Sequence, residues 1–93
     1  MKTFLITFYS TFHAIRFEKA MRESGYEPFS IPVPREISTS CGIAVRFTGE
    51  DADFINDFAK GSGLQFDKLY EIVIDQETKK KTYIKLQNNS DFT

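Results

Sequence analysis

The sequence predicts one α+β domain built from two helices and an antiparallel sheet, and three observations support this fold class. Apolar residues alternate with a period of two in five segments and recur with helical spacing in two others. Three prolines stand at alternate positions of one strand-like segment, which predicts a strand at the edge of the sheet. With 93 residues, the chain has room for one hydrophobic core but not for a second domain.

The chain begins with a segment, residues 2–9, in which both alternating sets of side chains are largely apolar. Such a pattern predicts a central strand with both faces covered. Ser10 or Thr11 can cap the helix that follows, because their side chains accept hydrogen bonds from the free N–H groups of the first turn. We expect this helix to run to about Ser24 and to be stopped by Gly25.

This first helix carries apolar residues on two sides. Ala14, Phe17 and Met21 share the face that we expect to pack on the sheet. Phe12 and Ile15 fall on the other side, among basic residues. They form either a partly covered rim, which we favour, or a contact surface for another chain.

The second strand holds the three prolines of the chain, and the residues between them are expected to face inward. In order, these positions are Pro28, Phe29, Ile31, Pro32, Val33 and Pro34. Proline has no N–H to donate to a neighbouring strand, so prolines at every second position place this strand at a sheet edge.

A third strand is expected over residues 43–47, followed by the second helix. Thr48 with Asp51 three residues later suggests a capping box, so we expect the helix to run from about Gly49 to Lys60. Its buried side chains would be Phe54, Ile55 and Phe58.

Two further strands complete the domain. Residues 68–74 and 82–86 both alternate, and the turn-rich residues between them predict a hairpin. The order strand, helix, strand, strand, helix, strand is that of the split βαβ, ferredoxin-like, two-layer sandwich. We therefore expect the sheet order 4-1-3-2, with the C-terminal hairpin strand added beside strand four. The domain would span residues 1–87, and residues 88–93 would form a frayed tail.

Composition excludes several classes of function. The net charge of −1 gives no basic footprint, so no nucleic-acid partner is expected. No apolar run has the length of a membrane span or the form of a signal peptide, so we expect no membrane association and a cytoplasmic protein. A single cysteine and a single histidine predict no intramolecular disulfide, no metal site and no cofactor.

Cys41 is the candidate reactive residue. It ends a hydroxyl-rich loop and precedes a glycine that has no side chain to shield the thiol. The predicted topology brings this loop to the end of the sheet at which the first helix begins, and a helix N-terminus favours the reactive thiolate. The candidate supporting residues are Arg35, Ser38, Thr39, Ser40, Gly42 and Arg46 around the loop, and Ser10, Thr11 and His13 at the helix start.

Each of these residues also has a simpler interpretation. Most free cysteines behave as small buried apolar side chains, which would make Cys41 structural. His13 could relay a proton to or from Cys41, and it could equally be an ordinary surface histidine. Arg35 could hold an anionic ligand or pair with Glu36 to steady the loop.

Two runs resemble the signature of DUF3343, a bacterial family described as selenium/sulfur carrier-like: PVPREIS at residues 32–38 and SCGIA at residues 40–44. The start of the chain, FLITFYST at residues 4–11, is similar to the start of that family. The resemblance covers roughly residues 2–74. It implies that Cys41 accepts sulfur or selenium, as a persulfide in the case of sulfur, and passes the atom on. Its partners would be a donor protein and an acceptor protein, and we expect a carrier rather than a turnover enzyme.

A second hypothesis assigns the chain to a different class, a non-catalytic regulatory or interaction module of ferredoxin-like fold. Cys41 would then be structural, and the exposed sheet face or edge strand would mediate homodimerisation or ligand sensing. A pKa of Cys41 well below the ~8.5 of a free thiol would favour the carrier.

Overall fold

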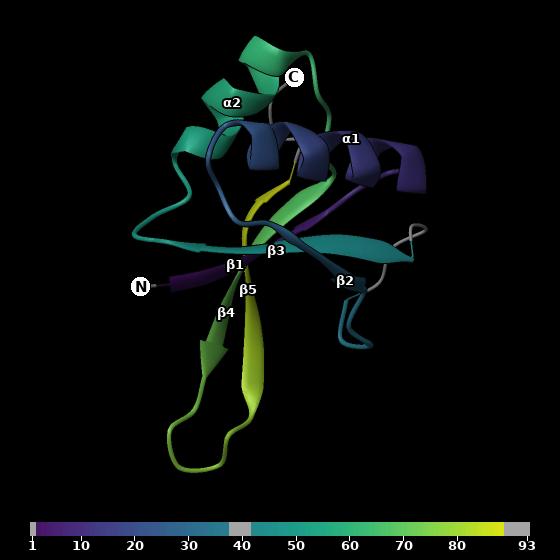
Figure 1. Ribbon diagram of the computed structural model, residues 1–93. Coiled ribbons are helices and arrows are strands. Elements are labelled where there is room, and N and C mark those ends of the chain that lie inside the picture. Colours follow the sequence, from purple (N-terminus) through teal and green to yellow (C-terminus); the bar gives the residue numbers. More distant parts are fainter. Residues whose placement is uncertain (1, 38–41, 89–93) are drawn as a thin grey trace.

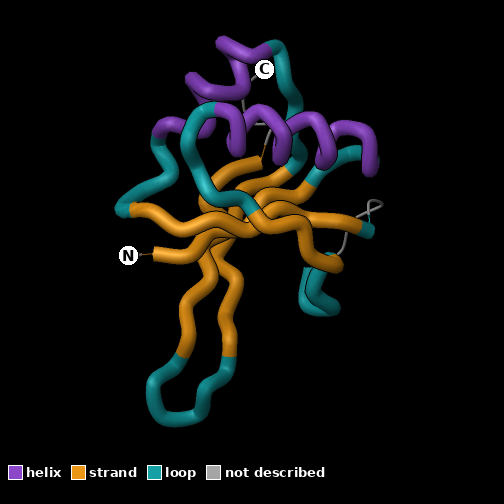
Figure 2. Tube along the Cα trace, viewed as in Figure 1, coloured by secondary structure: helices purple, strands orange, loops and turns teal. Residues whose placement is uncertain are grey.

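The computed structural model describes residues 2–37 and 42–88, and the fold is α+β as predicted. Two helices lie on one face of a five-stranded open sheet, and the tip of the β4–β5 hairpin projects away from the helices (Figures 1 and 2). The elements in chain order are β1 (Lys2–Thr7), α1 (Thr11–Glu23), β2 (Phe29–Pro32), β3 (Ile43–Gly49), α2 (Phe54–Ser62), β4 (Lys68–Ile74) and β5 (Lys81–Asn88).

The predicted order of the strands is confirmed. The sheet runs β2-β3-β1-β4-β5, and every neighbouring pair is antiparallel. Strand β1 is central, as its two apolar faces predicted: Phe4 lies between Phe47 of β3 and Glu71 of β4. The added C-terminal strand pairs with β4, also as predicted, and it ends at Asn88, one residue into the expected tail. Residues 89–93 lie outside the described part of the chain.

The edge position of β2 is confirmed, and its hydrogen bonding shows why prolines are accepted there. The N–H of Val33 donates to the carbonyl of Gly42 at 3.2 Å, which continues the pairing of β2 with β3. Because N–H groups of an antiparallel strand alternate between its two sides, those of Ile31 and Phe29 also point toward β3. The alternate positions, which include Pro32, point outward, where no partner strand needs a donor.

The expected side-chain pattern of β2 is only partly right. Ile31 and Val33 pack against the sheet, but Phe29 is 53% exposed and Pro28 is among the fully buried side chains. Phe29 begins the strand at the far end from the loop, and the guanidinium of Arg46 lies 5.4 Å from its ring centroid.

The main core lies between the sheet and the two helices. Ala14, Phe17 and Met21 are fully buried, which confirms the predicted core face of α1. The ring of Phe17 lies 5.4 Å from that of Phe8 and 5.5 Å from that of Phe58, so α1, α2 and the residue that follows β1 belong to one cluster.

Both ends of α1 are as predicted, but its outer side is not. Ser10 is the N-cap and Gly25 follows the helix with a left-handed φ of 94°, a conformation that glycine adopts at no steric cost. On the outer side, Phe12 is 63% exposed and Ile15 is 56% exposed. The partly covered rim expected there is therefore wrong.

The predicted start of the second helix is wrong as well. Strand β3 continues to Gly49, which pairs with Lys2, so the backbone at Thr48 and Gly49 is already committed to the sheet. The helix begins five residues later, at Phe54, with Asp53 as an N-cap that makes no side-chain capping bond. The expected capping box is therefore absent from this helix start.

The burial expected for α2 is correct for one of its three residues. Ile55 is fully buried, whereas Phe54 and Phe58 are half-buried at the edge of the core. Phe54 instead stacks on Tyr26, with ring centroids 4.7 Å apart and an interplanar angle of 9°. This aromatic pair ties the start of α2 to the turn after α1.

The tip of the β4–β5 hairpin is held by Asp75. Its carboxylate accepts hydrogen bonds from the backbone N–H groups of Glu77 at 2.8 Å and Thr78 at 3.1 Å. These bonds favour the ionised form and hold the pKa of Asp75 below its usual value. The next turn position, Lys79, has a left-handed φ of 60°.

Candidate functional site

Three segments meet at the end of the sheet where β1 stops, and Thr7 joins them. Thr7 is fully buried and pairs with Ala44 at the start of β3. Its carbonyl accepts from the N–H of Asp67 at 2.8 Å, and its hydroxyl Oγ1 accepts from the N–H of Lys68 at 3.2 Å. The end of β1, the start of β3 and the start of β4 are therefore fixed relative to one another.

The helix α1 begins at this same end. The hydroxyl of Ser10 accepts from the backbone N–H of His13 at 3.4 Å, as an N-cap does. The same Oγ lies 2.7 Å from Nδ1 of the half-buried His13 ring, and the ring tautomer decides which group donates. Thr11, the first helical residue, is exposed. Ser10 thus gives His13 a fixed partner, which the sequence did not indicate.

The loop that leads toward Cys41 starts underneath the sheet, on the face opposite the helices. The N–H of Ile37 donates to the carbonyl of Pro34 at 3.0 Å and closes a tight turn. Ile37 is only 6% exposed and packs with Leu5, Ala44 and Tyr70. We name residues 34–37 the Ile37 turn.

The charges of this turn have distinct surroundings. Arg35 and Glu36 are both exposed, and among residues 2–37 and 42–88 Arg35 forms no ion pair with Glu36. Burial raises the pKa of Tyr83 in β5, and the negative charge of Glu36 raises it further. The Ile37 turn therefore reaches from the β2 edge to the side of the sheet on which β5 lies.

Ser38, Thr39, Ser40 and Cys41 lie outside the described residues. The chain is described again from Gly42, which is exposed and whose carbonyl accepts from Val33. A Cβ added at Gly42 would meet no heavy atom within 4 Å. Packing therefore does not require a glycine at this position.

Arg46 is kept apart from the other candidate residues. It pairs with Leu5 in the middle of the sheet and is half-buried on the face opposite the helices, with its guanidinium over Phe29. The structure thus brings Ser10, Thr11, His13 and Gly42 to one end of the sheet. Arg46 lies away from this end, three residues after β3 begins at Ile43.

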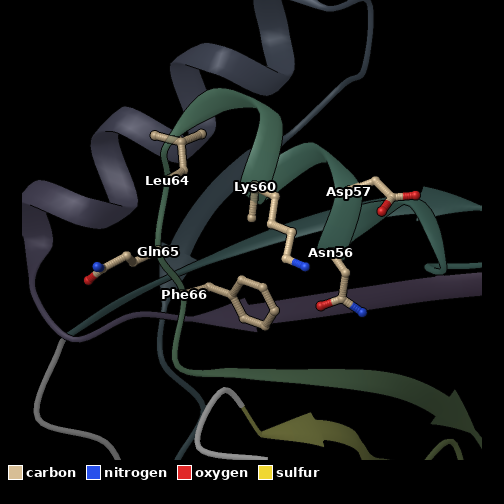
Figure 3. Close-up of a pocket in the computed structure, with 7 residues that line it drawn as sticks. Asn56, Asp57, Lys60, Leu64, Gln65 and Phe66 are labelled. Carbon is tan, nitrogen blue, oxygen red and sulfur yellow. The ribbon is translucent and has the colours of Figure 1, made fainter. Parts of the chain in front are cut away.

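Two hollows that share Leu64 and Gln65 were not indicated by the sequence. One, of about 150 Å³, is lined by His13, Arg16, Gly63, Leu64 and Gln65. The other, of about 170 Å³, lies beside α2 and is lined by Asn56, Asp57, Ala59, Lys60, Leu64, Gln65 and Phe66 (Figure 3). We name the second the α2 hollow.

The described part of the chain lacks two kinds of site. No three histidine, cysteine, aspartate or glutamate side chains within it come together as a group that could hold a metal ion. No helix within it is long and apolar enough to cross a membrane.

Comparison with known proteins gives one finding. Residues 3–71 match the model of a family described as "Putative Se/S carrier protein-like". No curated protein and no solved structure matches the chain. The matched residues include the Cys41 segment and end before the β4–β5 hairpin tip.

Proposed function

The chain belongs to the Se/S carrier protein-like family, and from this premise we propose that it carries a sulfur or selenium atom on Cys41. The observation that carries the proposal is the family match, because residues 3–71 include the one cysteine of the chain. A carrier of this kind needs a nucleophilic thiol that a partner protein can reach. It needs neither a metal nor a second cysteine.

The geometry at the end of the sheet supports a reactive thiol. Cys41 is bonded to the exposed Gly42, and the N-terminus of α1 lies at the same end, capped by Ser10. The partial positive charge of a helix N-terminus favours a thiolate over a thiol. Arg35, exposed in the Ile37 turn, would favour the thiolate in the same direction.

The proposed step is an exchange that needs no external oxidant or reductant. The Cys41 thiolate attacks the terminal sulfur of a persulfide on a donor protein. A new S–S bond forms to Cys41, the S–S bond of the donor breaks, and the donor cysteine leaves as a thiolate. An acceptor thiolate then removes the terminal sulfur from Cys41 in the same way. A donor perselenide would transfer selenium by the same exchange.

Two finer assignments accompany the proposal. We assign the two-layer arrangement to the ferredoxin-like, split βαβ class, on the basis of its element order and antiparallel strand order. We also assign the protein to a reducing, cytoplasmic setting, because a lone thiol must stay unoxidised to accept sulfur.

The test measures the alkylation rate of Cys41 against pH, and then the mass of the protein after exposure to a small-molecule persulfide. We expect alkylation in the folded protein with an apparent pKa below the ~8.5 of a free thiol, and a mass gain of one sulfur atom that Cys41→Ser abolishes. If Cys41 is inert to alkylation in the folded protein, the carrier proposal is wrong. The interaction module with a structural cysteine then takes its place.

A matched pair of arginine variants tests the electrostatic part of the proposal. Arg35→Ala should slow alkylation near neutral pH more than at pH 10, where the thiolate forms unaided. Arg46→Ala is the control, because Arg46 lies over Phe29 in the middle of the sheet. Equal slowing by both variants would show that Arg35 has no particular role at the thiol.

A further inference from the structure

The outer side of α1 presents an apolar side chain followed by two cations. Phe12, Arg16 and Lys19 are all exposed, and their spacing places them on one face of the helix. Phe12 is the most exposed of the large apolar side chains described, at 63%. The guanidinium of Arg16 lies over its ring, 5.4 Å from the centroid. We name these three residues the α1 row.

The α2 hollow has the size and walls to receive an aromatic ring. Its volume is about 170 Å³, and Ala59, Leu64 and Phe66 supply apolar walls. A dry cavity of about 150 Å³ accommodates a benzene molecule. Figure 3 shows the ring of Phe66 across from the side chain of Lys60, with Asp57 pointing away at the α2 side.

A row of acids leads away from this hollow along α2. Asp53 and Asp57 are exposed and four residues apart, so they lie on one face. From the C-terminal end of α2 toward its N-terminal end, this face presents Lys60 at the wall of the hollow, then Asp57, then Asp53. The α1 row therefore reads apolar, cation, cation, and the α2 face reads hollow, anion, anion.

We propose that the α1 row docks onto α2 of a second copy of this chain, with the two helices antiparallel. Phe12 enters the α2 hollow of the other copy, Arg16 lies against its Asp57, and Lys19 lies against its Asp53. The spacings agree, because Phe12 to Lys19 and Lys60 to Asp53 are both seven residues, about 10 Å of helix rise. The charges favour this antiparallel direction, since a parallel arrangement with Arg16 against Asp57 would place Lys19 against Lys60 and Phe12 against Asp53.

The positions of the row and the hollow within one copy allow a closed dimer. Leu64 lines the α2 hollow, and it also lines two neighbouring hollows that include Arg16. The α1 row and the α2 hollow are therefore adjacent on one side of the molecule. A two-fold axis beside Leu64 would form both contacts at once, so the assembly would stop at two copies.

The dimer does not depend on Cys41 or on sulfur transfer. Sedimentation of the full chain over a range of concentrations should show a monomer–dimer equilibrium, and Cys41→Ser should dimerise like the wild type. Phe12→Ser should weaken the dimer by about tenfold or more, as the loss of a buried aromatic anchor does. The control is Ile74→Ser, which removes another large apolar side chain, 47% exposed, from the remote hairpin.

Charge reversal tests the register itself. Arg16→Glu and Asp57→Arg should each prevent dimerisation, because each places like charges against one another in both contacts. An equimolar mixture of the two variants should form a heterodimer, since every contact then joins opposite charges. Circular dichroism of each variant checks that the fold is intact.

The outcomes separate the proposal from its alternatives. A wild-type chain that stays monomeric at near-millimolar concentration refutes the dimer. A dimer that Phe12→Ser leaves unchanged, or a mixture of the charge variants that stays monomeric, refutes this interface. The proposed interface is supported if each charge variant is monomeric by itself and the mixture of the two forms a dimer.

Discussion

The two faces of the sheet share the same strands but differ in what covers them. On one face Phe4 and Ile6 of β1 are buried beneath two helices. On the other face Leu5, from the same strand, is just as buried, yet no helix covers it: it lies in a small cluster with Ile37 and Tyr70. Further along this second face, Phe29 and Ile74 are 53% and 47% exposed.

This difference couples the second face to the candidate site. The helix side is stabilised by elements that do not depend on how the loop toward Cys41 is arranged. The opposite side owes part of its burial to Ile37 of that loop, which packs in one cluster with Leu5 and Tyr70. A change on the helix side should therefore alter stability without altering the reactivity of Cys41, whereas a change under the Ile37 turn should alter both.

The largest effect is expected on the helix side. Phe17→Ala should lower the free energy of unfolding by about 3–5 kcal/mol, because Phe17 is fully buried and contacts the rings of Phe8 and Phe58. Urea denaturation measures the change. Phe54→Ala is the comparison and should cost less, because Phe54 is only half-buried. Equal losses would show that half-burial understates the role of the Tyr26–Phe54 stack.

A smaller loss, about 2 kcal/mol, is expected for Ile37→Ala on the opposite face, since Ile37 packs in a cluster of few residues. The same variant should change the alkylation rate of Cys41 under conditions in which the protein remains folded. Denaturant titration and alkylation kinetics measure the two effects. An unchanged alkylation rate would mean that the turn and the thiol are independent.

The N-cap of α1 is expected to contribute less again. Ser10→Ala should cost about 1 kcal/mol, because it removes the side-chain acceptor for the N–H of His13. Ser10→Asp, which retains an acceptor, is the matched control and should recover most of the stability. Thermal unfolding of the three proteins distinguishes loss of the cap from a general effect of changing this residue.

The smallest effect concerns Tyr83, whose pKa is raised by burial and then by Glu36. The folded state holds the phenol proton more tightly than the unfolded state does. The resulting stability is complete below the usual tyrosine pKa of 10.0 and is lost as the pH rises through the raised folded value. Glu36→Gln should lower the Tyr83 pKa, measured by NMR of ring-labelled tyrosine. Glu27→Gln is the control, because Glu27 precedes β2 in the chain whereas Glu36 follows it, and this variant should leave the Tyr83 pKa unchanged.

Periodicity and proline chemistry were enough to predict the framework. The order of the elements, the central β1 and the edge β2 followed from alternation and from the missing N–H groups of Pro28, Pro32 and Pro34. The start of α2 could not be predicted in this way. Thr48 and Asp51 form a capping pattern that is local, and pairing of Gly49 with Lys2 overrides it.

The site was less predictable, because it depends on contacts between distant segments. Nothing near Ser10 in sequence indicates that Thr7 binds the backbone of Lys68. Ile37 is the one signal that was available: a large apolar side chain in a polar loop is expected to pack somewhere, and here it covers Leu5. The path of the whole turn decides which face of the sheet Ile37 covers, and the residues next to Ile37 in the sequence do not reveal that path.

The two free edges of the sheet are protected from aggregation by different means, and this has a consequence for handling the protein. At β2 the outward positions include Pro32, which offers no donor to an incoming strand. At β5 the protection is charge, from Lys81 and Lys85. Salt screens charge but does not restore a missing N–H, so strands of different molecules should join first at β5 when ionic strength is high. Turbidity that rises with added salt, and rises earlier in Lys85→Thr, would reveal this.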